Sequence, residues 1–248
     1  MTITHETTIG EIAASLPASI RLLERYGIDY CCGGGRPFEQ ACQEKGISAE
    51  QFLAELKTTQ QAAEASRPRS WSSATLSELI AHILEKHHNY LHTELPRLSD
   101  MLAKVVAAHG EKHPASLYPL QKVFAGVKEE LEAHMWKEEN ILFPLIQQTE
   151  RGQVAGAGFS PPGFSPPAMS VQGPIRMMEM EHDSAGNALE QMRQLTDNYQ
   201  APEDGCQTYR ALLEGIQTLE ADLHEHIHLE NNILFPRAIQ LESASLTR

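Results

Sequence analysis

The stretch HMWKEENILFP, residues 134–144, returns at residues 226–236 as HIHLENNILFP, and this repeated signature decides the fold. Both copies begin with His-x-x-x-Glu and end with the same apolar ILFP sequence. In an α-helix, residues four apart lie on one face, one turn from each other. Each copy is therefore expected to place a histidine beside a glutamate on one helix face.

Apolar residues around the two copies recur every three or four positions, which predicts helices. The same period extends over four long segments, at roughly 75–108, 116–148, 173–199 and 206–240. No part of the chain has the pattern of a pair of strands. The predicted fold class is all-α, with a four-helix bundle as its main part.

The chain before the bundle has the features of a second, smaller domain. Capping boxes that begin at Thr8 and Ser48 indicate short helices in this region. The polar stretch QQAAEASRPRS, which contains a proline, is the expected linker. We therefore predict a small helical domain at residues 1–65, followed by the bundle at residues 71–248.

Composition and charge exclude several classes of function. The formal net charge of −13 argues against nucleic acid or an anionic membrane as the main partner, because both would be repelled. No apolar run approaches the roughly 20 residues of a membrane helix, and the chain does not begin with a signal peptide pattern. Its four cysteines do not form the framework of a secreted disulfide protein. We expect a soluble, cytoplasmic protein.

Histidine is unusually frequent, with 12 residues in the chain. One histidine interrupts the inward apolar stripe of each predicted bundle helix, and the two signature helices each add a glutamate. Taken singly, such a histidine is more often a core residue, and a His-x-x-x-Glu pair is more often exposed. Burying six such groups in one core would cost a large free energy of desolvation, and a bound cation would remove this penalty. The candidate metal ligands are His88, His134, Glu138, His182, His226 and Glu230.

The type and number of these ligands favour two iron ions over one zinc ion. Six ligands are too many for one tetrahedral zinc, whereas imidazole with carboxylate suits iron. We expect two non-haem irons, bridged by both glutamates and by an oxide or hydroxide, with a position open to a small diatomic molecule. His92, one turn after His88, stays open as an additional or alternative ligand. His224 and His228 are expected to face solvent.

Cys31 and Cys32 lie side by side in the sequence DYCCGGG, residues 29–35. A helix that begins just after the glycines would lower the pKa of a nearby thiol. The functional interpretation is thiolate redox chemistry, transient binding of iron or a nitrosyl, or docking to a damaged cluster. The alternative is a tight turn that happens to contain thiols. Cys42 is expected to be buried packing.

One segment between the second and third bundle helices, residues 152–167, has the sequence GQVAGAGFSPPGFSPP. Its proline and glycine content excludes a regular helix. We expect a flexible surface connection, with a lid over the end of the bundle as the alternative.

With these motifs, the chain resembles the iron-sulfur cluster repair di-iron proteins, also called the Repair of Iron Centres or ScdA/YtfE family. The resemblance rests on DYCCGGG, on AHMWKEENILFP, and on MEMEHD followed by HIHLENNILFP, and it covers nearly the whole chain. It implies a haemerythrin-like bundle, repair of clusters damaged by nitric oxide or oxidative stress, and reaction with nitric oxide or oxygen. The implied partners are damaged iron-sulfur cluster proteins.

By position, the resemblance assigns the two irons to the six candidate ligands, with Glu138 and Glu230 bridging. Glu130 and Glu181 match acidic positions near the metal in the family, which implies that they relay protons or guide iron. Their alternative is that they are solvated helix glutamates. The chain departs from the family in its longer Gly/Pro connection and in Gly35, where relatives often have lysine.

Three functions stay open at this point. Cluster repair by supply of iron is favoured by the N-terminal cysteine domain. The second is reduction of nitric oxide at the di-iron site, and the third is a haemerythrin-type sensor or scavenger of oxygen or nitric oxide. Oxygen-carrying haemerythrins have a further histidine four residues after the third-helix ligand, where this chain has Gly186, which disfavours oxygen storage. Exchange of the two domains between the protomers of a homodimer also stays open.

Overall fold

The protein is seen here in a computed structural model, which describes residues 3–4, 6–63, 71–152 and 170–246. Throughout these residues the regular elements are helices, and a single bridge between Thr8 and Pro37 is the one strand-like pairing. The predicted all-α fold is therefore confirmed.

The chain divides into two compact units, which are Met1–Leu79 together with His224–Arg248, and Ile80–Leu223. Helices α5 (Leu76–Ile83) and α10 (Gln207–Leu229) each pass from one unit into the other. The predicted linker, residues 60–70, lies outside the described residues from residue 64 onward, and its first four residues end α4 (Ala49–Ala63). The Gly/Pro-rich connection predicted at residues 152–167 lies outside the described residues from residue 153 onward.

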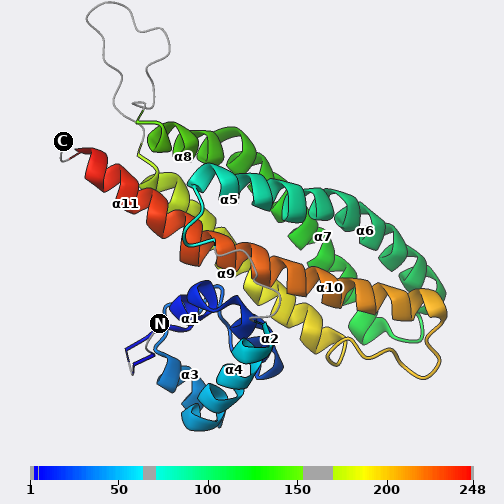
Figure 1. Cartoon of the computed structure of the whole chain (residues 1–248). Helices are drawn as coiled ribbons and strands as arrows, with labels where there is room; N and C mark the ends of the chain where they lie inside the picture. The colour runs from blue at the N-terminus through cyan, green and yellow to red at the C-terminus, as the bar shows by residue number, and fades with distance from the viewer. Residues whose placement is uncertain (1–2, 5, 64–70, 153–169, 247–248) are drawn as a thin grey trace, which may run out of the picture. The chain divides into compact units, whose positions relative to one another are not determined.

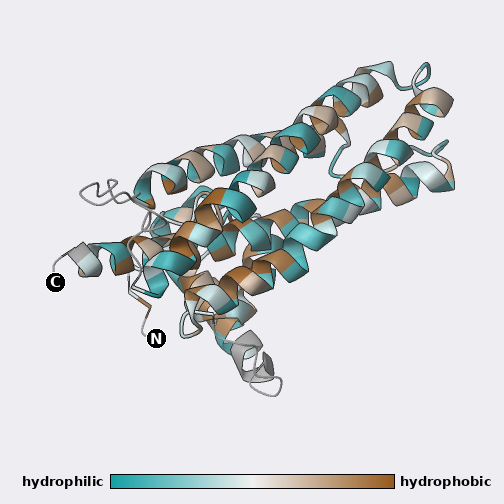
Figure 2. Ribbon diagram, turned by 90° about the horizontal axis from the view of Figure 1, so that it is seen from above, coloured by the Kyte–Doolittle hydropathy of each residue, from teal (hydrophilic) through white to brown (hydrophobic). Residues whose placement is uncertain are grey.

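The unit Ile80–Leu223 is a four-helix bundle. Helices α6 (Asn89–His109), α7 (Pro114–Lys137), α9 (Gln172–Leu195) and the first part of α10 run alongside one another (Figure 1). Hydrophobic and hydrophilic residues alternate along each helix, as an amphipathic bundle requires (Figure 2). The resulting core joins residues from all four helices, among them Leu95, Leu98, Phe124, Leu131, Leu189, Ile216 and Leu219.

Three short π-helical turns widen the helices that carry the histidines and glutamates. They are η3 (Leu84–His88), η4 (Glu138–Leu142) and η5 (Glu230–Leu234). After η4 and η5 the chain continues as α8 (Phe143–Glu150) and α11 (Phe235–Leu246). The Phe N–H of each ILFP sequence donates to the glutamate carbonyl five residues earlier. The proline that follows has no N–H to donate, so the wider turn leaves no donor without an acceptor at that position.

The other unit contains the predicted small helical region. Its helices are α1 (Ile9–Ser15), η1 (Pro17–Ser19), α2 (Ile20–Arg25), α3 (Phe38–Glu44) and α4 (Ala49–Ala63). The capping box predicted at Thr8 is present, because Thr8 and Glu11 exchange side-chain to backbone hydrogen bonds. These helices enclose a core of their own, which includes Ile9, Ile12, Leu23, Tyr30, Phe38 and Phe52.

Within the residues described, no helix is long and apolar enough to cross a membrane.

Candidate metal centre

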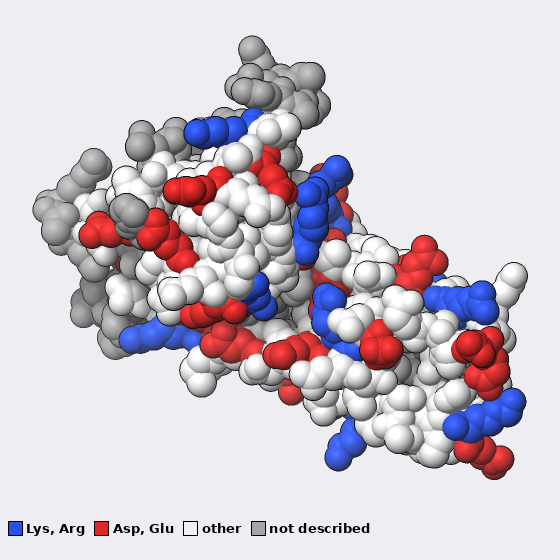
Figure 3. All heavy atoms as spheres, turned by 90° about the horizontal axis from the view of Figure 1, so that it is seen from below, with Lys and Arg blue, Asp and Glu red and all other residues white. Residues whose placement is uncertain are grey.

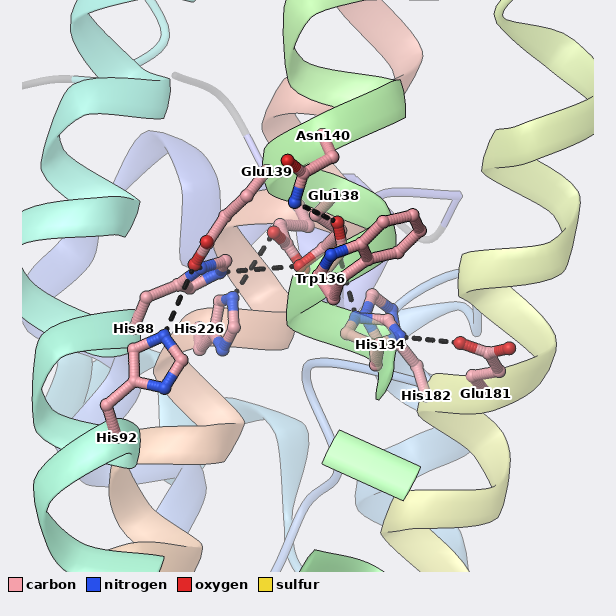
Figure 4. A network of polar contacts seen from close by, with 11 residues as sticks. His88, His92, His134, Trp136, Glu138, Glu139, Asn140, Glu181, His182 and His226 are labelled. Atoms are coloured by element: carbon pink, nitrogen blue, oxygen red, sulfur yellow. Dashed lines mark hydrogen bonds and ion pairs between the residues drawn. The ribbon is translucent and has the colours of Figure 1, made fainter. Parts of the chain in front are cut away.

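Four predicted ligands converge in the core of the bundle unit. His88 closes η3, His134 lies near the end of α7, Glu138 opens η4, and His182 lies on α9. All four side chains are buried, and the close view shows His88 and His134 on either side of Glu138 (Figure 4).

Glu138 contacts histidines with both carboxylate oxygens. Its Oε1 lies 3.2 Å from Nε2 of His134, and its Oε2 lies 3.3 Å from Nε2 of His88. Nε2 of His134 also lies 3.1 Å from Nε2 of His182. A carboxylate that faces one imidazole with each oxygen has the arrangement expected of a bridging ligand.

The second signature copy supplies the same pair in the other unit. Nε2 of His226 lies 3.2 Å from Oε1 of Glu230, the same distance as in the His134–Glu138 pair. Both side chains are buried. The duplicated sequence therefore folds into duplicated local geometry, in which an imidazole and a carboxylate one turn apart present ligand atoms on one helix face.

The carboxylates of Glu139 and Glu181, called the outer carboxylates below, each contact Nδ1 of a bundle histidine, the ring nitrogen that does not face Glu138. Oε1 of Glu139 lies 2.7 Å from Nδ1 of His88, and Oε2 of Glu181 lies 2.8 Å from Nδ1 of His134. Burial opposes ionisation of Glu181, but hydrogen bonds from Lys137 and His134 outweigh it and lower the pKa of this carboxyl. An ionised carboxylate accepts a hydrogen bond and so favours the proton on Nδ1, which leaves the lone pair on Nε2.

The tautomer with the proton on Nδ1 of His88 and of His134 shows whether these residues suit a metal ion. With the proton on Nδ1, Nε2 of His88 and of His134 are both acceptors that point at the acceptor oxygens of Glu138. Acceptors that converge at such distances repel each other unless a cation lies between them. Outer carboxylates on metal-binding histidines are also the usual support of such ligands. The donor set therefore fits a cation with nitrogen and oxygen ligands.

The other predicted site residues lie further out. Glu130 is exposed and accepts a hydrogen bond from Ser184. His92 is 53% exposed, and its Nε2 lies 3.4 Å from Glu139, so its described contact is with an outer carboxylate. The apolar stripe that predicts the candidate ligands does not predict a role for Glu139, because Glu139 lies outside that stripe.

The prediction for His228 is wrong. This side chain is buried, and its ring packs edge-on against Tyr30 with centroids 5.4 Å apart. Burial lowers the pKa of His228 to about 4, so the ring is neutral at physiological pH. His224 is half-buried and also packs against Tyr30. The helical period of α10 predicts which residues face the bundle core, but it does not predict the contact of His228 with Tyr30, because Tyr30 is far away in the chain.

Asp29 holds the turn that contains Cys31 and Cys32, called the thiol turn below. Its carboxylate accepts hydrogen bonds from the backbone N–H of Cys31 and of Gly33, and it lies 3.2 Å from Sγ of Cys31. A hydrogen bond with Cys32 and burial raise the pKa of Cys31 well above its ordinary value. The expected activation of this thiol by the next helix is therefore not found here. The predicted burial of Cys42 is confirmed, and all four cysteines are free thiols.

A helical bundle with a buried histidine and carboxylate cluster defines a class, the haemerythrin-like cation-binding proteins. The family model described as Hemerythrin HHE cation binding domain matches residues 79–160 and 164–238. A second family model, ScdA_N, described as a domain of unknown function, matches residues 5–60.

Relatives cover nearly the full chain. It is 40% identical over 236 residues to the iron-sulfur cluster repair protein YtfE of Escherichia coli O81, which covers 95% of this chain and 97% of the relative. The YtfE protein of Shigella boydii serotype 4 is 39% identical with the same coverage. A probable iron-sulfur cluster repair protein of Haemophilus influenzae is 37% identical over 234 residues, 93% of this chain and 96% of the relative. The chain belongs to the iron-sulfur cluster repair protein family.

Proposed function

We propose that this protein restores iron-sulfur clusters damaged by nitric oxide or oxidative stress, and that it does so by supplying iron. The observation that carries the proposal is the arrangement around Glu138, whose two oxygens face Nε2 of His88 and of His134. A single carboxylate between two histidines suits a pair of metal ions better than one. The relatives named as cluster repair proteins support the same function.

We further propose that two irons are held by both signature pairs together with the histidines of the other two helices. The ligands are then His88, His134, Glu138, His182, His226 and Glu230, with the two glutamates bridging. The basis for including His226 and Glu230 is that this pair has the local geometry and burial of His134 and Glu138. When bound, the irons supply a store of metal for rebuilding a cluster and a redox centre that reacts with nitric oxide or oxygen.

The outer carboxylates give the chain a route by which iron can leave. The side chains of Glu139 and Glu181 are 34% and 32% exposed, while each also bonds to a buried histidine. An oxygen donor in this position can accept a metal ion that a ligand histidine releases and present it to solvent. Glu130, which is exposed on the same helix as His134, is a further acidic group for this route.

The proposed partners are damaged iron-sulfur proteins, and the proposed location is the cytoplasm, where free thiols such as those of this chain persist. Nucleic acid is not proposed as a partner. Figure 3 shows acidic and basic side chains interspersed on one face, without a continuous basic patch over the residues described.

One observation favours a second candidate, reduction of nitric oxide at the metal centre. Cys31 is buried with a raised pKa, so its thiolate is scarce in this conformation, while the metal ligands do not depend on it. The test is recovery of a cluster enzyme damaged by nitric oxide, with nitrous oxide measured in parallel. We expect recovery with the iron-loaded protein and none with Glu138→Leu. Sustained nitrous oxide production with a reductant, without recovery of the enzyme, would replace repair by nitric oxide reduction.

A further inference from the structure

Asn232 makes unusual contacts for a helix residue. It lies two positions after Glu230, inside the π-helical turn η5. Its Nδ2 donates to the backbone carbonyl of Tyr30 at 3.1 Å and lies 3.3 Å from that of Cys31. The same nitrogen lies 3.1 Å from Nδ1 of His228. A single side-chain amide thus joins the thiol turn to the helix turn that begins with Glu230.

Two glycines make room for this amide. A Cβ added at Gly10 would lie 2.1 Å from Oδ1 of Asn232, and one added at Gly34 would lie 2.5 Å from the same atom. The two glycines are joined by a hydrogen bond of 2.7 Å from the N–H of Gly10 to the carbonyl of Gly34. Glycine allows the backbone to approach the amide this closely, which no other residue would. By contrast, Gly35 has open space around its Cβ position.

The first signature copy provides an internal comparison. Asn140 occupies the position that corresponds to Asn232, but its Nδ2 donates to the Trp136 carbonyl of its own helix at 2.8 Å. Trp136 in turn corresponds to His228, and the exposures differ widely, at 59% for Trp136 and 1% for His228. The two copies share their ligand pair but differ on the opposite face. Among the contacts of the described residues, the second copy alone uses this face to hold another segment of the chain.

We propose that Asn232 is a positioning residue that latches the Cys31–Cys32 turn to η5, and that release of this latch exposes the Cys31 thiol. The Cys31 side chain is 6% exposed while the latch is closed. Its carbonyl and that of Tyr30 are the acceptors of the latch, so loss of the amide acts directly on the backbone of the thiol turn. The inference goes beyond cluster repair, since it concerns access to a thiol and holds whether or not the metal centre performs the proposed function.

The test is site-resolved alkylation of the full-length protein with iodoacetamide, followed by mass spectrometry. Asn232→Ala should label Cys31 at least roughly threefold faster than wild type, the effect of one net hydrogen bond. Gly10→Ala should do the same from the opposite side, because its Cβ collides with the amide. Asn140→Ala and Gly35→Ala are the matched controls and should leave the rate unchanged. The exposed Cys206 reports the activity of the reagent in every sample.

Cys42 separates a local latch from general loosening. It is buried in the same small core as Tyr30, and it has no part in the latch. The latch requires that Cys31 labels faster while Cys42 stays protected. An unchanged Cys31 rate in Asn232→Ala and Gly10→Ala would overturn the proposal, and so would a parallel rise at Cys31 and Cys42. Iron content is measured on the same samples, so a fault in the metal centre is recognised separately.

Discussion

Oε1 of Glu139 lies 2.7 Å from Nδ1 of His88, which is 51 residues earlier in the chain. The residue that follows Glu138 therefore orients a histidine on another helix. Glu181 does the same for His134 from α9. Through these carboxylates the bundle fixes which ring nitrogen points inward, and this is the property that makes the cluster suitable for metal.

Replacing Glu139 or Glu181 by glutamine should weaken iron binding by about 10- to 100-fold, because the histidine loses its charged acceptor and its fixed tautomer. The measurement is a competition titration with a chelator of known affinity. Glu132→Gln is the control, since Glu132 forms an exposed pair with Lys128 on the same helix. Equal affinity in all three variants would show that the outer carboxylates do not support the ligands.

Glu138→Leu should abolish iron binding and with it the stability that iron supplies. At a free iron concentration 100 times the dissociation constant, that stability is about 2.7 kcal/mol. Thermal unfolding with and without a chelator checks the prediction, because wild type should shift on chelation and Glu138→Leu should not. His92→Ala should behave like wild type. The side chain of His92 is half-exposed, and its contact among the described residues is with the outer carboxylate of Glu139. A chelator shift that survives in Glu138→Leu would remove this residue from the ligand set.

The double substitution Cys31→Ser with Cys32→Ser should leave iron content and the iron spectrum intact but strongly reduce cluster repair. Cys31 and Cys32 lie in the unit that contains Met1–Leu79, whereas His88, His134, Glu138 and His182 lie in the bundle unit. The measurement is recovery of a nitric-oxide-damaged cluster enzyme by equal amounts of iron-loaded wild type and variant. Full recovery with the variant would show that the thiols are dispensable and would favour chemistry confined to the metal centre.

Ionisation of Cys31 should occur at higher pH than for an ordinary thiol, whose pKa is about 8.5. The hydrogen bond with Cys32 and burial favour the neutral form, so the pKa rises and the folded protein keeps this proton as pH increases. The check is thiolate absorbance in a pH titration, taken as the difference between wild type and Cys31→Ser. A midpoint at or below 8.5 would contradict the described environment of Cys31.

The buried histidines of the bundle and Glu138 could be located from sequence because they obey a local rule. His134 and Glu138 interrupt an apolar stripe of period 3.6, and a helix that packs in a bundle must bury that stripe. Glu139 and the burial of His228 could not be found in this way. Both depend on which segment lies opposite, and the partners, His88 and Tyr30, are far away in the chain. The helical period also does not predict the π-helical turns, although a Phe-Pro pair directly follows two of them, η4 and η5.

The most direct test of the central claim is the metal content of the purified protein, made with iron and measured together with its optical spectrum. The account predicts close to two irons per chain and the absorption of an oxo-bridged ferric pair, which disappears on reduction. Two irons are expected because a carboxylate that faces one imidazole with each oxygen, as Glu138 does, can bridge two ions. One zinc ion per chain, or no bound metal at all, would contradict it.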